Sequence, residues 1–325
     1  MQNARMQYRP LLLSLAGLAL AGAAFGFDLQ GHRGARGLRP ENTLPAFQHA
    51  LALGVDTIET DVAVTADGVV VISHDPYLNP LITRDAAGRW LTGSRGPLIR
   101  SLPLAQLQAY DVGRIQPGTS YAGTFATQQP VDGTHVPTLA QLFELAKARG
   151  ASHVRFNIET KTSPVQPDDA VPPEAMVQAL LKVVRGAGMA ARVSIQSFDW
   201  RTLQLVQKLE PGIPTVYLTV QTGSSDNTRD ARWTAGLDYA KYGSVPQMVK
   251  AAGGAVWSPN QGAVTEALVK EAQALGLKVV PWTVNDPAVM DRFIGWGVDG
   301  LISDYPDRLR EVLGKRGMPL PPRAP

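Results

Sequence analysis

The chain has 325 residues, no cysteine, 44% hydrophobic residues and a formal net charge of +3. The absence of cysteine excludes disulfides, thiolate zinc sites and a cysteine nucleophile. The small net charge and the lack of a lysine- or arginine-rich cluster argue against a nucleic-acid-binding protein.

The first 26 residues have the pattern of a secretory signal peptide. Arg5 and Arg9 stand in a stretch without acidic residues, and residues 11–25 are almost entirely apolar or small. We expect cleavage after Gly26, with cleavage after Ala23 as the alternative. An uncleaved anchor is the competing interpretation, but the apolar stretch is shorter than the roughly 20 residues of a spanning helix. The sequence therefore predicts a periplasmic or secreted protein with no stable membrane insertion after signal removal.

Apolar, β-branched runs alternate with amphipathic helical stretches over the rest of the chain. The eight expected strands are Phe27–His32, Thr57–Ala63, Val154–Glu159, Arg192–Gln196, Thr215–Thr219, Ala255–Ser258, Val279–Thr283 and Gly300–Ser303. The expected helices include Leu44–Leu53, Leu139–Arg149, Pro173–Ala187, Trp200–Leu209, Thr265–Leu275 and Pro287–Gly295. This alternation predicts an α/β fold, a (β/α)8 TIM barrel with functional residues at the carboxyl ends of its strands. A doubly wound open sheet is the alternative, but no glycine-rich dinucleotide-binding turn follows the first run.

Two segments depart from a plain barrel. Val69–Ser73 follows the turn dipeptide Asp67-Gly68, so we expect it to fold back on the second strand and to return His74 toward the site. Residues from about 76 to 137 are rich in glycine and proline and have few long apolar runs, which indicates a functional insertion. The predicted organisation is a signal peptide (1–26), one domain (27–314) with a capping insertion (about 76–137), and a disordered proline-rich tail (315–325).

Two carboxylates share one face of the second strand. Glu59 and Asp61 are two residues apart in a β-branched run, and the strand period of two places both on the same face. Two like charges on a largely buried strand are costly unless a cation or hydrogen-bond donors compensate them. The pair therefore favours a site for a hard divalent cation over the alternative of a solvated edge strand.

Two imidazoles and an arginine lie close to these carboxylates in the sequence. His32 and Arg33 follow the first strand, and His74 follows the hairpin. Imidazoles titrate near neutrality and can act as acid and base, while a guanidinium matches the oxygens of a phosphate group. These residue types fit metal-assisted cleavage of a phosphodiester, with one imidazole on each side of phosphorus. The residues do not decide which imidazole is the acid.

A series of short motifs makes the chain similar to one known family. The motifs, in chain order, are His32-Arg33-Gly34, Pro40-Glu41-Asn42-Thr43, Glu59-Thr60-Asp61, Ser73-His74-Asp75, Ile158-Glu159-Thr160-Lys161, Gln196-Ser197-Phe198, Trp282-Thr283-Val284-Asn285 and Asp299-Gly300-Leu301-Ile302-Ser303-Asp304-Tyr305-Pro306. On these residues the chain resembles the glycerophosphodiester phosphodiesterase family from His32 to the last strand. The resemblance implies a TIM-barrel enzyme that hydrolyses glycerophosphodiesters to sn-glycerol 3-phosphate and an alcohol. It also implies that the insertion caps the active site and shapes the leaving-group pocket.

The resemblance implies roles for individual residues as well. His32 and His74 are expected to be the catalytic histidines. Glu59, Asp61 and Glu159 are expected to bind one divalent cation, and three carboxylates without cysteine favour Ca²⁺ or Mg²⁺. The residues expected to bind the substrate or its phosphate are Arg33, Lys161, Asn42, Gln196 and Trp282. Glu41 and Asp75 are expected to orient these groups.

Several alternatives stay open at this point. Asn42 could instead cap the helix that begins near Thr43, Lys161 could be a surface lysine, and Trp282 could be a core residue. A phospholipase D-like or lysophospholipase D activity on the same fold is the enzymatic alternative. A non-catalytic surface binding protein is the alternative from another class. The expected partner is a small-molecule glycerophosphodiester, attacked either by water or first by its own glycerol hydroxyl.

Overall fold

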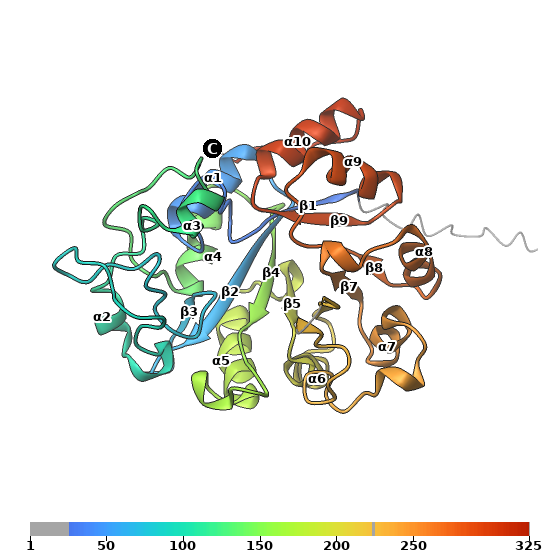
Figure 1. Ribbon diagram of the computed structural model, residues 1–325, viewed down its shortest axis with the longest axis horizontal. Helices are drawn as coiled ribbons and strands as arrows, with labels where there is room; N and C mark the ends of the chain where they lie inside the picture. Colours follow the sequence, from blue (N-terminus) through green and yellow to red (C-terminus); the bar gives the residue numbers. More distant parts are fainter. Residues whose placement is uncertain (1–25, 223–224, 325) are drawn as a thin grey trace, which may run out of the picture.

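The computed structural model describes residues 26–222 and 225–324, so the predicted signal peptide, apart from Gly26, lies outside the described residues. The strands are β1 (Asp28–Gly31), β2 (Thr57–Val64), β3 (Val70–Ile72), β4 (Arg155–Thr160), β5 (Val193–Ser197), β6 (Thr215–Thr219), β7 (Val256–Pro259), β8 (Lys278–Val279) and β9 (Gly300–Ser303). Eight of them pair in parallel in the order β8-β7-β6-β5-β4-β2-β1-β9. Figure 1 shows these strands at the centre of a ring of helices. The predicted TIM barrel is confirmed.

A few backbone hydrogen bonds join β8 and the residues after it to β9. Asp299 N donates to Val279 O at 2.9 Å, and Ile302 N donates to Pro281 O at 3.0 Å. The expected strand Val279–Thr283 is nevertheless wrong in its bounds, because β8 ends at Val279. Pro281 has no N–H to donate, which interrupts the ladder on this strand. The barrel is thus nearly closed, with its weakest pairing beside β9.

The helices that surround the barrel are amphipathic. They are α1 (Leu44–Leu53), α4 (Leu139–Ala148), α5 (Pro173–Gly186), α6 (Trp200–Leu209), α7 (Val245–Ala251), α8 (Glu266–Ala274), α9 (Pro287–Gly295) and α10 (Pro306–Lys315). All of them except α5 and α10 begin at a side-chain cap. Thr43 caps α1 by accepting a hydrogen bond from Ala46 N, and Thr138 forms a capping box with Gln141. The helices α7 and α10 were not among the helices expected from the sequence.

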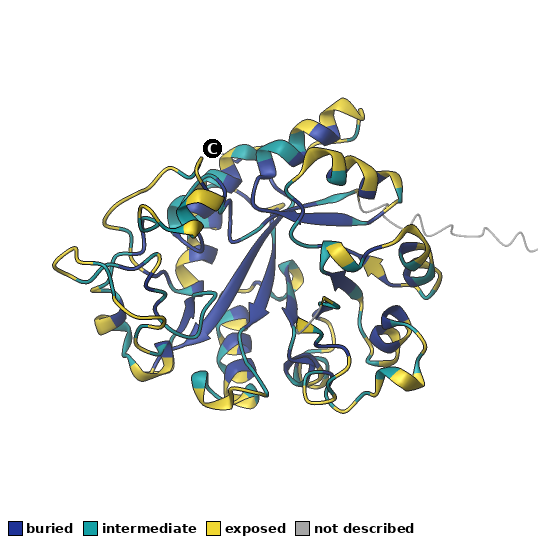
Figure 2. Ribbon diagram, viewed as in Figure 1, coloured by how far each residue is buried: buried dark blue, intermediate teal, exposed yellow. Residues whose placement is uncertain are grey.

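One apolar core lies between the strands and the inner faces of the helices. Figure 2 shows the strands buried and the outer faces of the helices exposed. The largest fully buried side chains include Phe47, Phe143, Phe156 and Trp200, which lie on α1, α4, β4 and α6. Burial of these aromatic groups on helices and strands alike is what fixes the helices against the barrel.

The hairpin and the insertion form a second, smaller unit beside β2. The strand β3 pairs antiparallel with β2, and Gly68 takes a φ of 78° in the turn, which confirms the predicted hairpin. The insertion contains α2 (Leu104–Leu107) and α3 (Ser120–Thr124). Its apolar side chains form a separate cluster against the hairpin, composed of Ala63, Val71, Leu78, Ile99, Leu107, Val112 and Val136.

The segment after α10 lies against the start of the barrel. Arg310 Nη1 donates to Gly54 O and to Pro321 O, each at 2.7 Å, and Ala324 N donates to Leu51 O at 2.9 Å. The sequence predicted a disordered tail from residue 315. In the structure, Pro321 of this tail contacts α10 and Ala324 contacts the end of α1.

Candidate active site

The predicted site residues gather at the carboxyl ends of the barrel strands. His32 follows β1, Glu59 and Asp61 lie on β2, His74 follows β3, and Glu159 lies on β4. A cavity of about 130 Å³ there is lined by both histidines, Glu59 and Glu159, together with Arg33, Arg36, Gln196, Phe198, Leu218, Trp282, Thr283 and Ile302. Parallel strands place all their carboxyl ends at one rim, which explains why residues far apart in sequence meet here.

Three buried carboxylates form a cluster at this rim. Glu59, Asp61 and Glu159 each offer an oxygen within 4.8 Å of the others, and their exposed fractions are 2%, 1% and 7%. Burial, with the neighbouring Asp61 charge, raises the pKa of Glu59 well above its usual value. Burial also raises the pKa of Glu159 to about 7. Burial opposes ionisation of Asp61 too, but His74, Lys161 and Arg33 keep its pKa below its usual value.

This cluster fits a divalent cation with oxygen ligands. Asp61 Oδ1 is buried and has no hydrogen-bond partner, although Asp61 Oδ2 accepts a hydrogen bond from Asn42. A buried carboxylate oxygen without a donor needs a positive charge to balance it. The three carboxylates are the kind of ligand that Ca²⁺ and Mg²⁺ prefer. Among the described residues, this is the one group of three or more potential ligands close enough to hold a metal.

His32 is held in one orientation by a carboxylate that the sequence analysis did not assign. Asp304, directly after β9, lies 2.6 Å from His32 Nδ1, and His32 Nε2 lies 3.8 Å from Glu59 Oε2. Burial and Arg36 lower the pKa of His32 to about 4, although Asp304 favours protonation. A neutral ring that donates from Nδ1 keeps Nε2 free to face the carboxylate cluster.

Asp304 also accepts hydrogen bonds from two other polar side chains. It accepts hydrogen bonds from Arg36 Nε at 2.8 Å, from Arg36 Nη2 at 3.1 Å and from Asn285 Nδ2 at 2.7 Å. Asp304 is 1% exposed, and its pKa lies far below its usual value because His32 and Arg36 outweigh the effect of burial. Its place at the carboxyl end of a strand, within the last of the motifs, was the sequence signal that could have identified it.

His74 has a looser environment. Its Nδ1 lies 3.1 Å from Asp75 Oδ1, and Asn79 Nδ2 donates to Asp75 Oδ2 at 2.8 Å. The side chain of His74 is 34% exposed, compared with 12% for His32. Burial, followed by the charges of Arg33 and Lys161, lowers its pKa. Asp75 therefore lies within hydrogen-bond distance of His74 and is itself held by Asn79.

Arg33 lies between the carboxylates and the cavity. Its backbone N donates to Glu59 Oε2 at 2.8 Å, and its Nη1 donates to Glu41 Oε1 at 2.5 Å. Its Nε is buried without a hydrogen-bond partner, 3.5 Å from Asp61 Oδ2. Glu41 is in turn bound by the Tyr121 hydroxyl, which comes from α3 of the insertion. The insertion therefore contacts the network that holds Arg33.

Asn42 and Lys161, which the sequence also predicts for the site, each contact a carboxylate of the cluster. Asn42 Nδ2 donates to Asp61 Oδ2 at 2.8 Å, and the cap of α1 is Thr43, so Asn42 orients a carboxylate and is not the cap. Lys161 Nζ lies 2.8 Å from Glu159 Oε1 and 3.7 Å from Asp61 Oδ1, which excludes a solvated surface lysine.

An amide chain inside the barrel orients Glu59. Gln196 Nε2 donates to Glu59 Oε1 at 2.7 Å, and Gln196 Oε1 accepts from Asn157 Nδ2 at 2.8 Å. Asn157 was not singled out in the sequence. Trp282 lines the cavity, packs edge-on against Phe198, and donates from Nε1 to Ser258 O at 2.9 Å.

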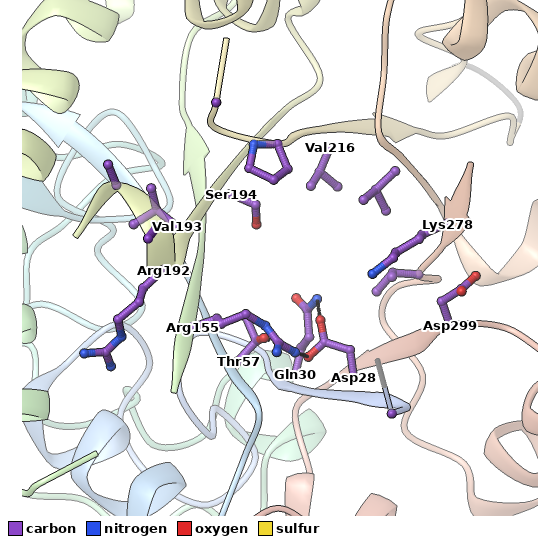
Figure 3. A pocket seen from close by; sticks show the side chains of 17 residues that line it. Asp28, Gln30, Thr57, Arg155, Arg192, Val193, Ser194, Val216, Lys278 and Asp299 are labelled. Carbon is purple, nitrogen blue, oxygen red and sulfur yellow. Dashed lines mark hydrogen bonds and ion pairs between the residues drawn. The ribbon is translucent and has the colours of Figure 1, made fainter. Parts of the chain in front are cut away.

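A larger cavity, of about 550 Å³, lies at the opposite end of the barrel (Figure 3). Several of its charged groups are engaged by neighbouring groups: Asp28 Oδ1 lies 3.0 Å from Arg155 Nη2, and Arg192 donates to Val154 O. It contains neither of the predicted histidines and none of the clustered carboxylates. We therefore place the active site at the carboxyl rim.

The carboxyl rim of this parallel barrel holds two histidines and a buried carboxylate cluster. Such an arrangement is typical of a hydrolase that can use a divalent cation. The sequence model of the "Glycerophosphoryl diester phosphodiesterase family" matches residues 32–308. The chain belongs to this family, whose members hydrolyse glycerophosphodiesters, so the expectation of a phosphoric diester hydrolase is confirmed.

Known relatives and solved structures are similar over nearly the whole chain. A glycerophosphodiester phosphodiesterase from Caldanaerobacter subterraneus subsp. tengcongensis is 29% identical over 286 residues, which are 88% of this chain and 97% of the relative. The structure of a putative glycerophosphoryl diester phosphodiesterase from Silicibacter pomeroyi is 38% identical with a TM-score of 0.82, and covers 91% of this chain and 96% of its own. A phosphodiesterase from Oleispira antarctica, solved with the product sn-glycerol-3-phosphate, is 24% identical with a TM-score of 0.65, and covers 89% of this chain and 98% of its own.

In the part of the chain that the structure describes, none of the helices is both long and apolar enough to span a bilayer.

Proposed function

We propose that the protein hydrolyses glycerophosphodiesters to sn-glycerol 3-phosphate and an alcohol, with His32 and His74 as the acid–base pair. The observation that carries this proposal is the single cavity that both histidines share with Arg33, Glu59 and Glu159. A phosphodiester held there would have its phosphorus between the two imidazoles. One imidazole takes a proton from the attacking oxygen, and the other protonates the departing alkoxide.

Glu59, Asp61 and Glu159 would hold one Ca²⁺ or Mg²⁺ ion. Bound there, the ion would polarise a phosphoryl oxygen and offset the negative charge of the transition state. Asp61 Oδ1 supports this assignment, because it is buried without a hydrogen-bond partner and has only the Lys161 ammonium at 3.7 Å. The oxygen-only ligand set favours these two ions over zinc.

Positively charged groups beside the cluster would bind the phosphate. Arg33 Nε is buried and unpartnered, which suits a donor that waits for a phosphoryl oxygen. Lys161, bound to Glu159, lies close enough to reach the same group. Gln196 and Trp282 line the cavity deeper in the barrel and would contact the glycerol moiety, the amide through hydrogen bonds and the indole through its apolar face.

We also propose that residues 1–26 direct export and are removed, so that the enzyme acts in the periplasm or outside the cell. The basic start and the apolar stretch support this proposal. Amino-terminal sequencing of the exported protein tests it: a first residue at Phe27 or Ala24 agrees, and a retained Met1 contradicts it.

The activity is tested by release of sn-glycerol 3-phosphate from glycerophosphocholine by metal-stripped protein, with Ca²⁺, Mg²⁺ or no cation added back. We expect turnover to return with one of these ions and to be lost in His32→Ala and His74→Ala. His135→Ala is the matched control, because His135 is exposed in the insertion and lies outside the cavity. No turnover with either ion, or full activity of both histidine variants, would contradict the proposal.

A substrate with a better leaving group shows which histidine is the acid and which is the base. The p-nitrophenyl ester of glycerol phosphate has a leaving group that departs without a proton. The variant that lacks the acid should recover most of its activity on this ester, whereas the variant that lacks the base should stay inactive. Phosphorus NMR during the same reaction reveals whether a cyclic phosphate precedes sn-glycerol 3-phosphate.

A further inference from the structure

A second cavity adjoins the catalytic cavity on the far side of Glu159. It has a volume of about 330 Å³, and it shares Glu159 and Phe198 with the catalytic cavity of about 130 Å³. The catalytic cavity contains both histidines, and the second contains neither. A phosphodiester with its phosphorus beside Glu159 could therefore place one substituent in each cavity.

The second cavity is formed mainly by two barrel loops. Lys161 and residues 162–170 follow β4, while Trp233 belongs to the connection between β6 and α7. Trp233 is fixed by its backbone: its N donates to Asp230 O, and its O accepts from Trp200 N, each at 2.9 Å. Because Trp200 is fully buried at the start of α6, the position of Trp233 is set by the core.

The charged side chains around this cavity have partners of their own. Lys161 is bound to Glu159, and Asp169 is bound to Arg95 of the insertion. The Arg95 guanidinium in turn lies 4.4 Å from the centre of the Tyr77 ring. The charged groups of the cavity are thus engaged in ion pairs.

The other lining residues are the polar Thr162, Ser163 and Gln166 and a group of apolar and aromatic residues. Phe198, Trp233, Pro76 and Val165 all line the cavity, and Val165 is one of the few large hydrophobic residues that are exposed, at 44%. Aromatic rings attract quaternary ammonium groups through cation–π interactions, and tryptophan does so best. The lining therefore suits a compact cation with an apolar surface.

We infer that this second cavity binds the leaving alcohol, and that Trp233 makes the enzyme select alcohols that carry a quaternary ammonium group. The inference rests on the proposed function, since it assigns the part of the substrate that departs. It also differs from the expectation that the insertion forms the leaving-group pocket. Here the insertion lines the cavity through Pro76 and holds its rim through Arg95, while the barrel loops supply the selecting surface.

The test compares two substrates that differ only in the leaving alcohol, glycerophosphocholine and glycerophosphoglycerol. We expect the wild-type protein to have the higher kcat/KM for glycerophosphocholine. Trp233→Ala should lower that value about tenfold and leave glycerophosphoglycerol within about twofold, because a desolvated cation–π contact is lost only for choline. Trp233→Phe should restore most of the preference. Trp90→Ala, which changes a tryptophan outside both cavities, should leave the ratio unchanged.

Choline binding without turnover provides a readout that does not depend on catalysis. We expect the Kd of free choline, measured by calorimetry in the presence of sn-glycerol 3-phosphate, to rise about tenfold in Trp233→Ala. An equal loss of kcat/KM for both substrates, or an unchanged Kd for choline, would overturn the inference. A wild-type protein that cleaves neither diester but binds choline through Trp233 would contradict the proposed function and support the choline site.

Discussion

Asp304→Asn is the most informative substitution, because Asp304 joins His32, the proposed catalytic histidine, to Arg36. One carboxylate oxygen faces His32 Nδ1 and Arg36 Nε, and the other faces Arg36 Nη2 and Asn285 Nδ2. An amide of the same shape would turn its NH₂ group toward two of these donors in either orientation. The substitution therefore keeps the volume of the side chain but loses its charge and part of its hydrogen bonding.

The expected losses follow from the burial of these groups. A hydrogen bond between charged groups contributes about 1.5–3 kcal/mol, and Asp304 is 1% exposed, so we expect a loss of about 3 kcal/mol in the free energy of unfolding. For a domain of this size that corresponds to a Tm lower by roughly 6 °C. Since acid–base catalysis contributes about 10²–10⁴-fold, a misoriented His32 should lower kcat by about 10²-fold or more, with a smaller change in KM.

The control is Asp299→Asn, at the opposite end of β9. Asp299 Oδ2 accepts hydrogen bonds from Val279 N at 2.8 Å and from Gln273 Nε2 at 3.2 Å, so its replacement should lower Tm without changing kcat. Steady-state kinetics and thermal unfolding of both variants provide the comparison. If Asp304→Asn lowers only Tm, as the control does, then His32 does not depend on Asp304 and the reasoning is refuted.

Three further predictions concern the rest of the site. Tyr121→Phe removes the hydrogen bond to Glu41 and should raise KM about fivefold with kcat nearly unchanged, which corresponds to about 1 kcal/mol of binding free energy. Tyr110→Phe in the same insertion should change neither constant. Equal effects of the two substitutions would contradict the role of Tyr121. A divalent cation at 100 times its Kd should stabilise the metal-stripped protein by about 2.7 kcal/mol, which raises Tm by roughly 6 °C. Glu159→Gln should reduce or abolish this rise. An unchanged Tm with every divalent ion tested would contradict the metal site. Gly34→Ala should lower Tm by several degrees, because Gly34 has a φ of 85° and a Cβ there would lie 2.9 Å from the backbone of α1; an unchanged Tm would contradict this packing.

Local patterns in the sequence were sufficient to predict the barrel and the pair Glu59 and Asp61. Short β-type runs identify the strands, and the strand period of two places both carboxylates on one face. Glu159 was added to this pair by the family resemblance, and the structure brings the three carboxylates together.

Several partners that orient these groups were missed, because they depend on contacts between distant segments. Asp304 had a local signal in its place within the last motif, but nothing local links it to His32. Asp304 and His32 are 272 residues apart and meet only because β9 pairs with β1. Tyr121 lies in an insertion without a regular pattern, and nothing local indicates that its hydroxyl reaches Glu41. Asn157 is one polar residue within a buried strand, and the neighbouring strand determines that it orients Gln196.

The charges of the site explain why stability and activity should depend on the same ion. Glu59 is fixed by hydrogen bonds from Gln196 and from the backbone of Arg33, so it cannot turn away from the other carboxylates. Without a cation, burial and the repulsion between the carboxylates favour protonation and raise the pKa values of Glu59 and Glu159. A divalent cation bound there would offset that repulsion and keep the carboxylates ionised. The hydrogen bonds that fix Glu59 therefore hold the cluster ready for the ion.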